Sequence, residues 1–480
     1  MNNLFIGRKK EQQQLREYIE SQQSEFITVY GRRRVGKTFL IQKVIGNGYA
    51  FYAAGMNSVS MRTQLANFMQ GIRKNRPETP AAKSWLDAFI ALETYLESLP
   101  EGKKIVFIDE MPWMDTPRSN FISGLEHFWN SWASWRTDIK LIVCGSATSW
   151  IINNLIKNRG GLHNRVTHKI LLKPFTLREC QEYFSARGFR LSVKQIAECY
   201  MVLGGVPFYL SKMDKGESVP QNIDRLIFAP EGELHDEFQS LYNSLYKNAE
   251  NHIKIVTALA SKGKGLTRSE LIKVTRLPDN GKFSTKLEEL ESCGFIRSYE
   301  PFKSKRNGFD TIQSPDTLFQ LVDPFTLFYF QIMRKAQTKD QNYWTNNQQS
   351  HVFSTWSGLS FEMLCLNHFE QIKAALGISG ITANVCSWFG KGDSRSAQID
   401  MLIDRADNTV NICEMKYYSN PYALTAHDEE NIERKISTFR ESTNTDKNII
   451  LTMITIKGIV QNEHSACVQK EIRLDDLFEE

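Results

Sequence analysis

The chain has 480 residues, of which 41% are hydrophobic and 24% are charged, and its formal net charge is +5 at pH 7. This length exceeds what one compact core usually supports, so we expect two to four domains of ordinary globular composition. The mild positive charge is compatible with a nucleic-acid partner but is too small to indicate one.

The eight cysteines stand singly along the chain, and none forms a CxxC pair. This spacing argues against structural zinc and is typical of a protein in a reducing compartment. No run approaches the ~20 apolar residues that cross a membrane. The first residues, MNNLFIGRKKEQQQL, lack the apolar core of a secretory signal. We therefore expect a cytoplasmic protein without membrane contact.

The strongest motif in the chain is FITVYGRRRVGKTFLI, residues 26–41. An apolar strand leads into G-x4-GKT and then into a helical pattern, which is the context that a phosphate-binding loop requires. Glycines let backbone amides turn toward phosphate, the lysine reaches the β- and γ-phosphates, and the threonine hydroxyl binds Mg²⁺. The predicted loop comprises Gly31, Arg32, Arg33, Arg34, Val35, Gly36, Lys37 and Thr38.

Two further strands end in polar residues. KKIVFIDE ends in Asp109 and Glu110, and IKLIVCGSA ends near Ser146. Burying two acids is costly without a function, so we expect Asp109 to hold Mg²⁺ and Glu110 to polarise the attacking water. Ser146 is a weaker candidate for sensing the γ-phosphate, because many strands end in Gly-Ser for reasons of turn geometry.

The five predicted strands of this region alternate with helices, which favours a parallel sheet with helices on both faces and a ligand at the carboxyl ends of the strands. They span residues 26–31, 50–55, 103–109, 139–146 and 167–172.

Six segments together resemble the archaeal-type ATPases of the AAA+/STAND-like class, which have a P-loop NTPase α/β core. They read FIGRKKE (5–11), YGRRRVGKT (30–38), FIDEMPW (107–113), VCGSATSW (143–150), LLKPFTLREC (171–180) and LGGVPFYL (203–210).

This resemblance implies ATP and Mg²⁺ as cofactors. It also implies that Gly7, in the segment from Phe5 to Arg8, lies near the adenine, and that Pro207 belongs to a helical lid. Arg165 occupies the position of a sensor or finger arginine, although an ordinary surface arginine is the alternative. A finger would require a nucleotide-dependent homo-oligomer. The three loop arginines are either structural or contact a partner.

The resemblance and the patterns together predict four domains: the ATPase core at 1–172, a helical lid at 173–245, a winged helix at 246–334, and an α/β restriction-endonuclease-like domain at 345–480. In the winged helix, residues 251–302 show three helices by apolar spacing, and the basic turn 303–308 is the predicted wing. This part either contacts DNA through its third helix and wing or only packs against the ATPase as a regulatory domain.

The last domain contains the segment NICEMKYYS, in which Glu414 and Lys416 share one strand face. A three-residue loop at 406–408 would place Asp400 opposite Glu414, whereas a two-residue loop would separate them. The order of helix, two strands, helix and strand resembles the PD-(D/E)XK nuclease superfamily. That resemblance implies that Asp400 and Glu414 bind Mg²⁺, that Lys416 assists catalysis, and that Glu362 completes the site. Ile399 stands where the superfamily has proline.

These patterns predict an ATP-hydrolysing protein that couples nucleotide state to a Mg²⁺-dependent nuclease-like domain. Its partner is expected to be DNA or RNA, and the sequence does not distinguish the two. One alternative is a regulatory or scaffolding ATPase whose last domain binds nucleic acid or protein without cleavage. Another is a winged-helix DNA-binding regulator. A further alternative for the acidic residues of the last domain is a solvated hairpin face without function.

Overall fold

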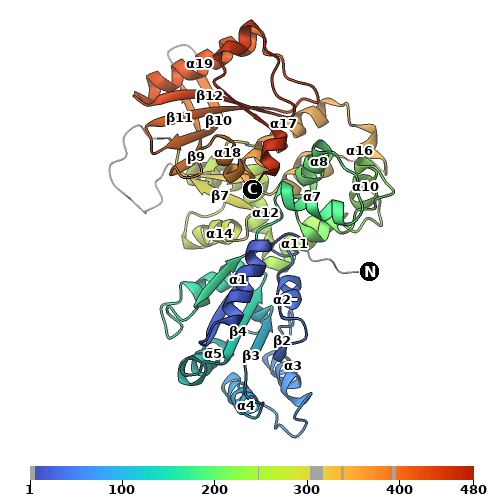
Figure 1. The fold of residues 1–480 in the computed structure, drawn as a ribbon, viewed down its shortest axis with the longest axis vertical. Helices are drawn as coiled ribbons and strands as arrows, with labels where there is room; N and C mark the ends of the chain where they lie inside the picture. The colour runs from blue at the N-terminus through green and yellow to red at the C-terminus, as the bar shows by residue number, and fades with distance from the viewer. Residues whose placement is uncertain (1–5, 247, 303–316, 337–339, 392–395, 480) are drawn as a thin grey trace. The chain divides into compact units, whose positions relative to one another are not determined.

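The computed structural model describes residues 6–246, 248–302, 317–336, 340–391 and 396–479 (Figure 1). The chain divides into two compact units, residues 1–173 and 174–480. The predicted lid, winged helix and last domain all fall within the second unit, and the finer boundaries among them remain predictions. Phe5 and the predicted wing at 303–308 lie outside the described residues.

The first unit is built on a five-stranded parallel sheet in the order β2-β3-β4-β1-β5. The five strands predicted from the sequence are confirmed to within a residue or two at each end. The sheet comprises β1 (Glu25–Tyr30), β2 (Tyr49–Ala54), β3 (Lys104–Asp109), β4 (Ile139–Gly145) and β5 (His168–Leu171). The helices are α1 (Lys9–Glu20), α2 (Lys37–Ile45), α3 (Met61–Arg73), α4 (Trp85–Glu97), α5 (Phe121–His127) and α6 (Thr148–Ile151).

Helices cover both faces of this sheet, which explains why its central strands are continuous apolar runs. Every residue of β3 and β4 is buried. Leu15 of α1 and Leu40 of α2 pack on one face. Phe68 of α3 and Phe89 of α4 pack on the other. The two apolar layers hold β1, β3 and β4 in register, so that their carboxyl ends meet at one edge.

The second unit begins with five helices in the region predicted as a lid. They are α7 (Leu177–Ala186), α8 (Val193–Leu203), α9 (Pro207–Leu210), α10 (Val219–Ile223) and α11 (Glu237–Leu245). Thr176 and Ser192 cap the first two helices with reciprocal side-chain bonds.

The middle of the second unit contains three helices and a three-stranded antiparallel sheet in the order β6-β8-β7. The assignment of this part as a winged helix stays a prediction. They are α12 (Ala249–Ala260), β6 (Leu266–Thr267), α13 (Arg268–Thr275), α14 (Gly281–Ser292), β7 (Ile296–Tyr299) and β8 (Leu318–Leu321). The helices α15 (Pro324–Phe328) and α16 (Tyr343–Asn346) follow.

The last part of the second unit is a mixed five-stranded sheet in the order β13-β12-β11-β10-β9 (Figure 1). Strands β9, β10 and β11 pair antiparallel, and β11, β12 and β13 pair parallel. The elements are α17 (His351–Asn367), α18 (Phe369–Ala375), β9 (Ala383–Lys391), β10 (Ser396–Arg405), β11 (Thr409–Lys416), α19 (Ala426–Thr443), β12 (Asn448–Thr455) and β13 (Lys470–Arg473).

The hairpin of β10 and β11 has the three-residue loop, at residues 406–408, that was predicted to place Asp400 opposite Glu414. The strands pair Met401 with Cys413 and Asp404 with Val410. Asn408 adopts a left-handed backbone with φ of 58°, as three-residue hairpin loops often require. Continuing this register by one residue places Asp400 opposite Glu414.

One apolar core runs through the second unit from Phe175 to Phe478. A smaller core joins the middle part to the last sheet, where Phe302 lies 4.9 Å from Phe439 between ring centroids. The Tyr299 hydroxyl also bonds Ser387 of β9. The middle part is therefore packed against the last sheet and α19. Within the described ranges, no helix is both long enough and apolar enough to cross a membrane.

Candidate functional site

The loop between β1 and α2 has the backbone shape that phosphate binding requires. Gly31 has a φ of 142°, and a Cβ there would lie 2.2 Å from the carbonyl oxygen of Leu172. Gly36 has a φ of 91° and immediately precedes α2, and no heavy atom lies within 4 Å of the place that a Cβ would take. Only glycine fits the first position, and the second leaves open space in front of the helix N-terminus, where backbone amides favour an anion.

Lys37 and Thr38 begin α2 and point toward the edge where the strands end. The Lys37 ammonium donates to the carbonyl oxygens of Gly31 and Arg32 at 3.0 and 2.9 Å. The Thr38 hydroxyl lies 2.9 Å from one carboxylate oxygen of Asp109 and 3.2 Å from the other. The loop, the lysine and the two predicted magnesium ligands therefore meet at one place.

Glu110, the second acid, is held by the end of the neighbouring strand. Its Oε2 accepts hydrogen bonds from the Ser146 amide at 3.0 Å and from the Ser146 hydroxyl at 2.9 Å. Its backbone is left-handed, with φ of 42°, which is uncommon for a residue with a side chain. Ser146 thus contacts the acid that the sequence assigned to the attacking water.

Cys144, to which no role was assigned from the sequence, lies on β4 beside Asp109. Its Sγ lies 2.6 Å from Asp109 Oδ1, and its side chain is fully buried. Burial, followed by the negative charge of Asp109, raises the pKa of the Cys144 thiol well above its usual value. The group is therefore a protonated donor to the carboxylate. A lone cysteine in an apolar strand gives no signal of this contact in the sequence.

The remaining predicted nucleotide residues occupy varied positions. Arg32 and Val35 are buried, Arg33 is half-buried, and Arg34 is half-buried with a left-handed backbone of φ 71°. Gly7 accepts a bond from Gln12 of α1 and precedes Arg8, whose guanidinium bonds the carbonyl of Lys173. Arg165 is exposed on the turn before β5, so its two interpretations both stay open. Pro207 begins α9 in the second unit. The contacts of these residues with nucleotide remain predictions.

The donor set at the strand edge fits Mg·ATP. A hydroxyl and a carboxylate, which are ligands suited to Mg²⁺, lie within 2.9 Å of each other at Thr38 and Asp109. Magnesium takes few protein ligands in nucleotide sites and completes its shell with phosphate and water oxygens. Lys37 adds a cation beside the open loop. The residues present are therefore those that a metal–nucleotide complex needs.

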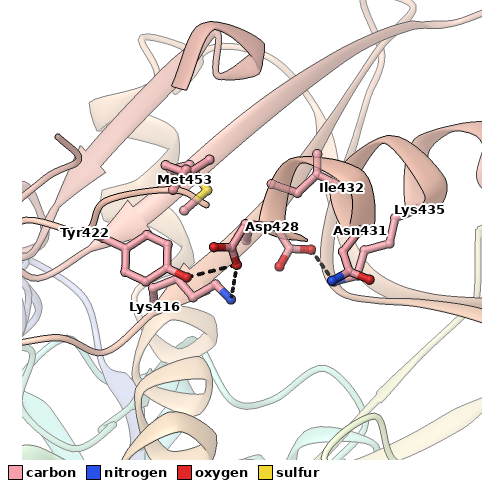
Figure 2. A pocket seen from close by; sticks show the side chains of 9 residues that line it. Lys416, Tyr422, Asp428, Asn431, Ile432, Lys435 and Met453 are labelled. Carbon is pink, nitrogen blue, oxygen red and sulfur yellow. Dashed lines mark hydrogen bonds and ion pairs between the residues drawn. The ribbon is translucent and has the colours of Figure 1, made fainter. Parts of the chain in front are cut away.

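A second candidate site is a pocket of about 140 Å³ in the last domain (Figure 2). Glu414 and Lys416 both line it, as their shared strand face predicts. The ammonium of Lys435 pairs with Glu414. Lys416 lies 3.6 Å from Asp428, which also accepts a bond from the Tyr422 hydroxyl at 2.9 Å. Each predicted residue thus has a partner of opposite charge from α19.

Residues of α19 in this pocket were not predicted from the sequence. Asp428, Asn431, Ile432 and Lys435 all line it. Their spacing of three, four and seven places them on one helical face, which is the signal that could have found them. The sequence alone does not show which face of the sheet this helix covers.

Asp400 and Glu362 do not line this pocket. A β-bulge between Ile399 and Leu402 interrupts the alternation beside Asp400, whose Oδ1 accepts a bond from Gln398 at 2.5 Å. That Asp400 points the same way as Glu414 and Lys416 stays a prediction, because a bulge can change the side-chain direction that strand pairing would give.

Glu362 on α17 lies within electrostatic reach of the other two acids. Burial, followed by the negative charges of Asp400 and Glu414, raises the pKa of Glu362 to about 8. Among the residues that the structure describes, however, no three histidine, cysteine or acidic side chains form a group that could hold a metal ion. Magnesium binding by Asp400, Glu414 and Glu362 therefore stays a prediction.

Comparisons with known proteins agree with the first site. Residues 5–213 match the family described as ATPase domains predominantly from Archaea. An uncharacterized protein of Methanocaldococcus jannaschii is 23% identical over 403 residues, which cover 83% of this chain and 84% of the relative.

Solved structures give weaker likenesses. A Walker-type ATPase of Pyrococcus abyssi has 17% identity, covers 68% of this chain and 96% of its own, and gives a TM-score of 0.46. The ORC2 protein of Aeropyrum pernix has 16% identity, covers 67% of this chain and 92% of its own, and gives a TM-score of 0.31. Both scores are too low to carry the assignment.

The assignment depends instead on the family match and on the geometry inside it. The matched residues contain the whole phosphate loop, both acids after β3, and Ser146. In the first unit these groups meet at the carboxyl edge of a parallel sheet, which is where ligands of such sheets bind. Residues 5–213 therefore match an archaeal-type ATPase domain, and the protein is an ATPase.

Proposed function

We propose that the protein binds Mg·ATP at the loop of residues 31–38 and hydrolyses it with Glu110 as the residue that orients the attacking water. The observation that carries this proposal is the meeting of Lys37, Thr38, Asp109 and Glu110 at one strand edge. In this role Lys37 exchanges its bonds to loop carbonyls for bonds to phosphate oxygens. Thr38 and Asp109 hold Mg²⁺, which offsets phosphate charge when bound.

Ser146 sits where it can serve both as a sensor of the γ-phosphate and as a restraint on Glu110. Its hydroxyl and amide now bind Glu110 Oε2. When the Ser146 hydroxyl donates to a phosphate oxygen instead, Glu110 keeps only its bond to the Ser146 amide. Its carboxylate can then turn toward water. The proposal thus couples the arrival of ATP to the release of the acid.

Replacing Ser146 with alanine tests this exchange. We expect Ser146→Ala to lower the preference for an ATP analogue over ADP by about tenfold, the value of one hydrogen bond to a charged group. Turnover should fall as well, because the γ-phosphate loses a donor. The two dissociation constants, measured by calorimetry with Mg²⁺, give the ratio.

The matched control is Ser149→Ala, three residues farther along in α6. We expect it to leave the ratio of the two affinities unchanged. An unaltered ratio in Ser146→Ala would show that the hydroxyl does not sense the γ-phosphate.

A second candidate function concerns the last domain. We propose that it is a PD-(D/E)XK-like module that recognises nucleic acid under the control of the ATPase. The order of α17, the β10–β11 hairpin, α19 and β12, together with the hairpin register, supports this relationship. The pairing of Glu414 with Lys435 favours recognition without cleavage over Mg²⁺-dependent cutting.

The charge arrangement gives the physical reason. An ammonium beside Glu414 supplies the positive charge that a metal would otherwise provide, and the second acid of the pocket, Asp428, is occupied by Lys416 and Tyr422. Lys416 then faces a carboxylate inside the pocket, and it can also meet a phosphate at the pocket mouth. The regulatory alternative of a protein partner would use the same module without nucleic acid.

Incubation of the full chain with labelled DNA and RNA in Mg²⁺ or Mn²⁺, with and without ATP, separates these alternatives. We expect salt-sensitive binding without shortening of either substrate, and weaker binding for Lys416→Met. The control Lys470→Met changes an exposed lysine of β13 and should bind as the wild type does. Metal-dependent cleavage that disappears in Glu414→Gln would instead establish a nuclease, and absence of any binding would exclude the nucleic-acid proposal.

A further inference from the structure

Asp109 is held by three groups of different kinds. Its Oδ1 accepts from the Cys144 thiol at 2.6 Å, from the Glu110 amide at 2.9 Å and from the Thr38 hydroxyl at 3.2 Å. Its Oδ2 accepts from the Thr38 hydroxyl at 2.9 Å. Thr38 is a predicted metal ligand itself. When a cation takes the threonine hydroxyl, the thiol and the amide are the groups in this set that still hold Oδ1.

The position of Cys144 is fixed more firmly than that of a surface donor. It lies on β4, all of whose residues are buried, and β4 pairs with both β1 and β3. Thr28 to Tyr30 of β1 run beside it, with Val29 opposite Cys144. The sheet therefore sets the distance between the thiol and the carboxylate, so the contact can orient Asp109 without rearrangement of its own.

We propose that Cys144 is a positioning residue that orients Asp109 for the divalent cation of the nucleotide complex. This inference rests on the roles proposed above for Thr38 and Asp109. A donor at Oδ1 restrains the plane of the carboxylate and leaves Oδ2 facing the Thr38 hydroxyl, so these two oxygens would hold the cation when it is bound. The thiol therefore affects the Mg²⁺ concentration that the protein needs, and it does not contact the phosphates itself.

Two substitutions distinguish the loss of the hydrogen-bond donor from a change in side-chain volume. Cys144→Val keeps a small apolar side chain of similar size but removes the donor, and Cys144→Ser restores an O–H. We expect Cys144→Val to raise the Mg²⁺ concentration for half-maximal phosphate release by about tenfold, within the range for a hydrogen bond to a charged group. Cys144→Ser should recover most of this loss.

A second readout does not depend on turnover. ADP affinity is measured with excess EDTA and then across a Mg²⁺ titration. We expect Cys144→Val to match the wild type in EDTA and to show the same rise in Mg²⁺ requirement for tight binding. Cys199→Ala removes another buried cysteine, in α8 of the second unit, and should change neither quantity.

The outcomes are distinct. A wild type whose affinity for nucleotide is indifferent to Mg²⁺ would contradict the proposed roles of Thr38 and Asp109. A Mg²⁺-dependent wild type with an unchanged Cys144→Val would overturn the inference about Cys144 alone. Equal loss in Cys144→Val and Cys144→Ser, with lower thermal stability in both, would assign the cysteine to packing and also overturn it. Should the valine variant fail to fold, Cys144→Ala takes its place in the comparison with serine.

Discussion

Lys37→Ala abolishes nucleotide binding: this is the largest effect that we expect from a single substitution. Lys37 is buried at the first position of α2, and its ammonium reaches the carbonyls of the loop. Removing it takes away the only side-chain charge that the phosphate-loop motif places against the β- and γ-phosphates. Several charge-assisted bonds are lost together, so the affinity for ATP should fall by at least ~100-fold.

Equilibrium binding of a fluorescent ATP analogue measures this loss. The matched control is Lys43→Ala, which removes an exposed lysine from the last turn of the same helix and should bind as the wild type does. Because Lys37 also bonds loop carbonyls, thermal unfolding of both variants without nucleotide should be recorded alongside. Tight ATP binding by a folded Lys37→Ala protein would show that residues 31–38 are not the phosphate-binding loop.

Glu110→Gln separates binding from chemistry. Glutamine keeps the size of the side chain and an oxygen that Ser146 can bond, but it cannot accept a proton from water. We expect the rate of the chemical step to fall by about 10²- to 10⁴-fold, the usual contribution of a general base. Affinity for Mg·ATP should stay within about threefold, because the interaction is needed in the transition state alone.

Single-turnover hydrolysis, with enzyme in excess over labelled ATP, measures the chemical step of Glu110→Gln directly. Glu101→Gln changes an exposed acid a few residues before β3 and serves as the control, with a rate equal to that of the wild type. A Glu110→Gln variant that hydrolyses ATP at the wild-type rate would require another residue to orient the water.

The first sheet could be predicted from the sequence because its strands are buried on both faces. Each reads as a short apolar run that ends at a motif, and the motif fixes both the end of the strand and the place of the ligand. Lys37, Thr38, Asp109 and Glu110 were all found this way. Cys144 was not, because its role comes from the pairing of β4 beside β3.

The last domain was harder to predict for reasons of register and packing. The loop of residues 406–408 gave the pairing of β10 with β11, since loop length sets hairpin register. The bulge beside Asp400 depends on β9, whose sequence ANVCSWFGK shows no clean alternation and was not identified as a strand. Lys435 lies 21 residues from Glu414, so their pairing depends on how α19 packs on the sheet.

Phosphate release from Mg·ATP, measured together with the amount of bound nucleotide, tests the central claim most directly. The wild-type chain should release phosphate continuously. Glu110→Gln should remain loaded with ATP yet release almost none, and Lys37→Ala should neither bind nor release. A wild-type chain that hydrolyses ATP with both variants unimpaired would contradict the account, because the reaction would then take place outside the site formed by the loop of residues 31–38 and the end of β3.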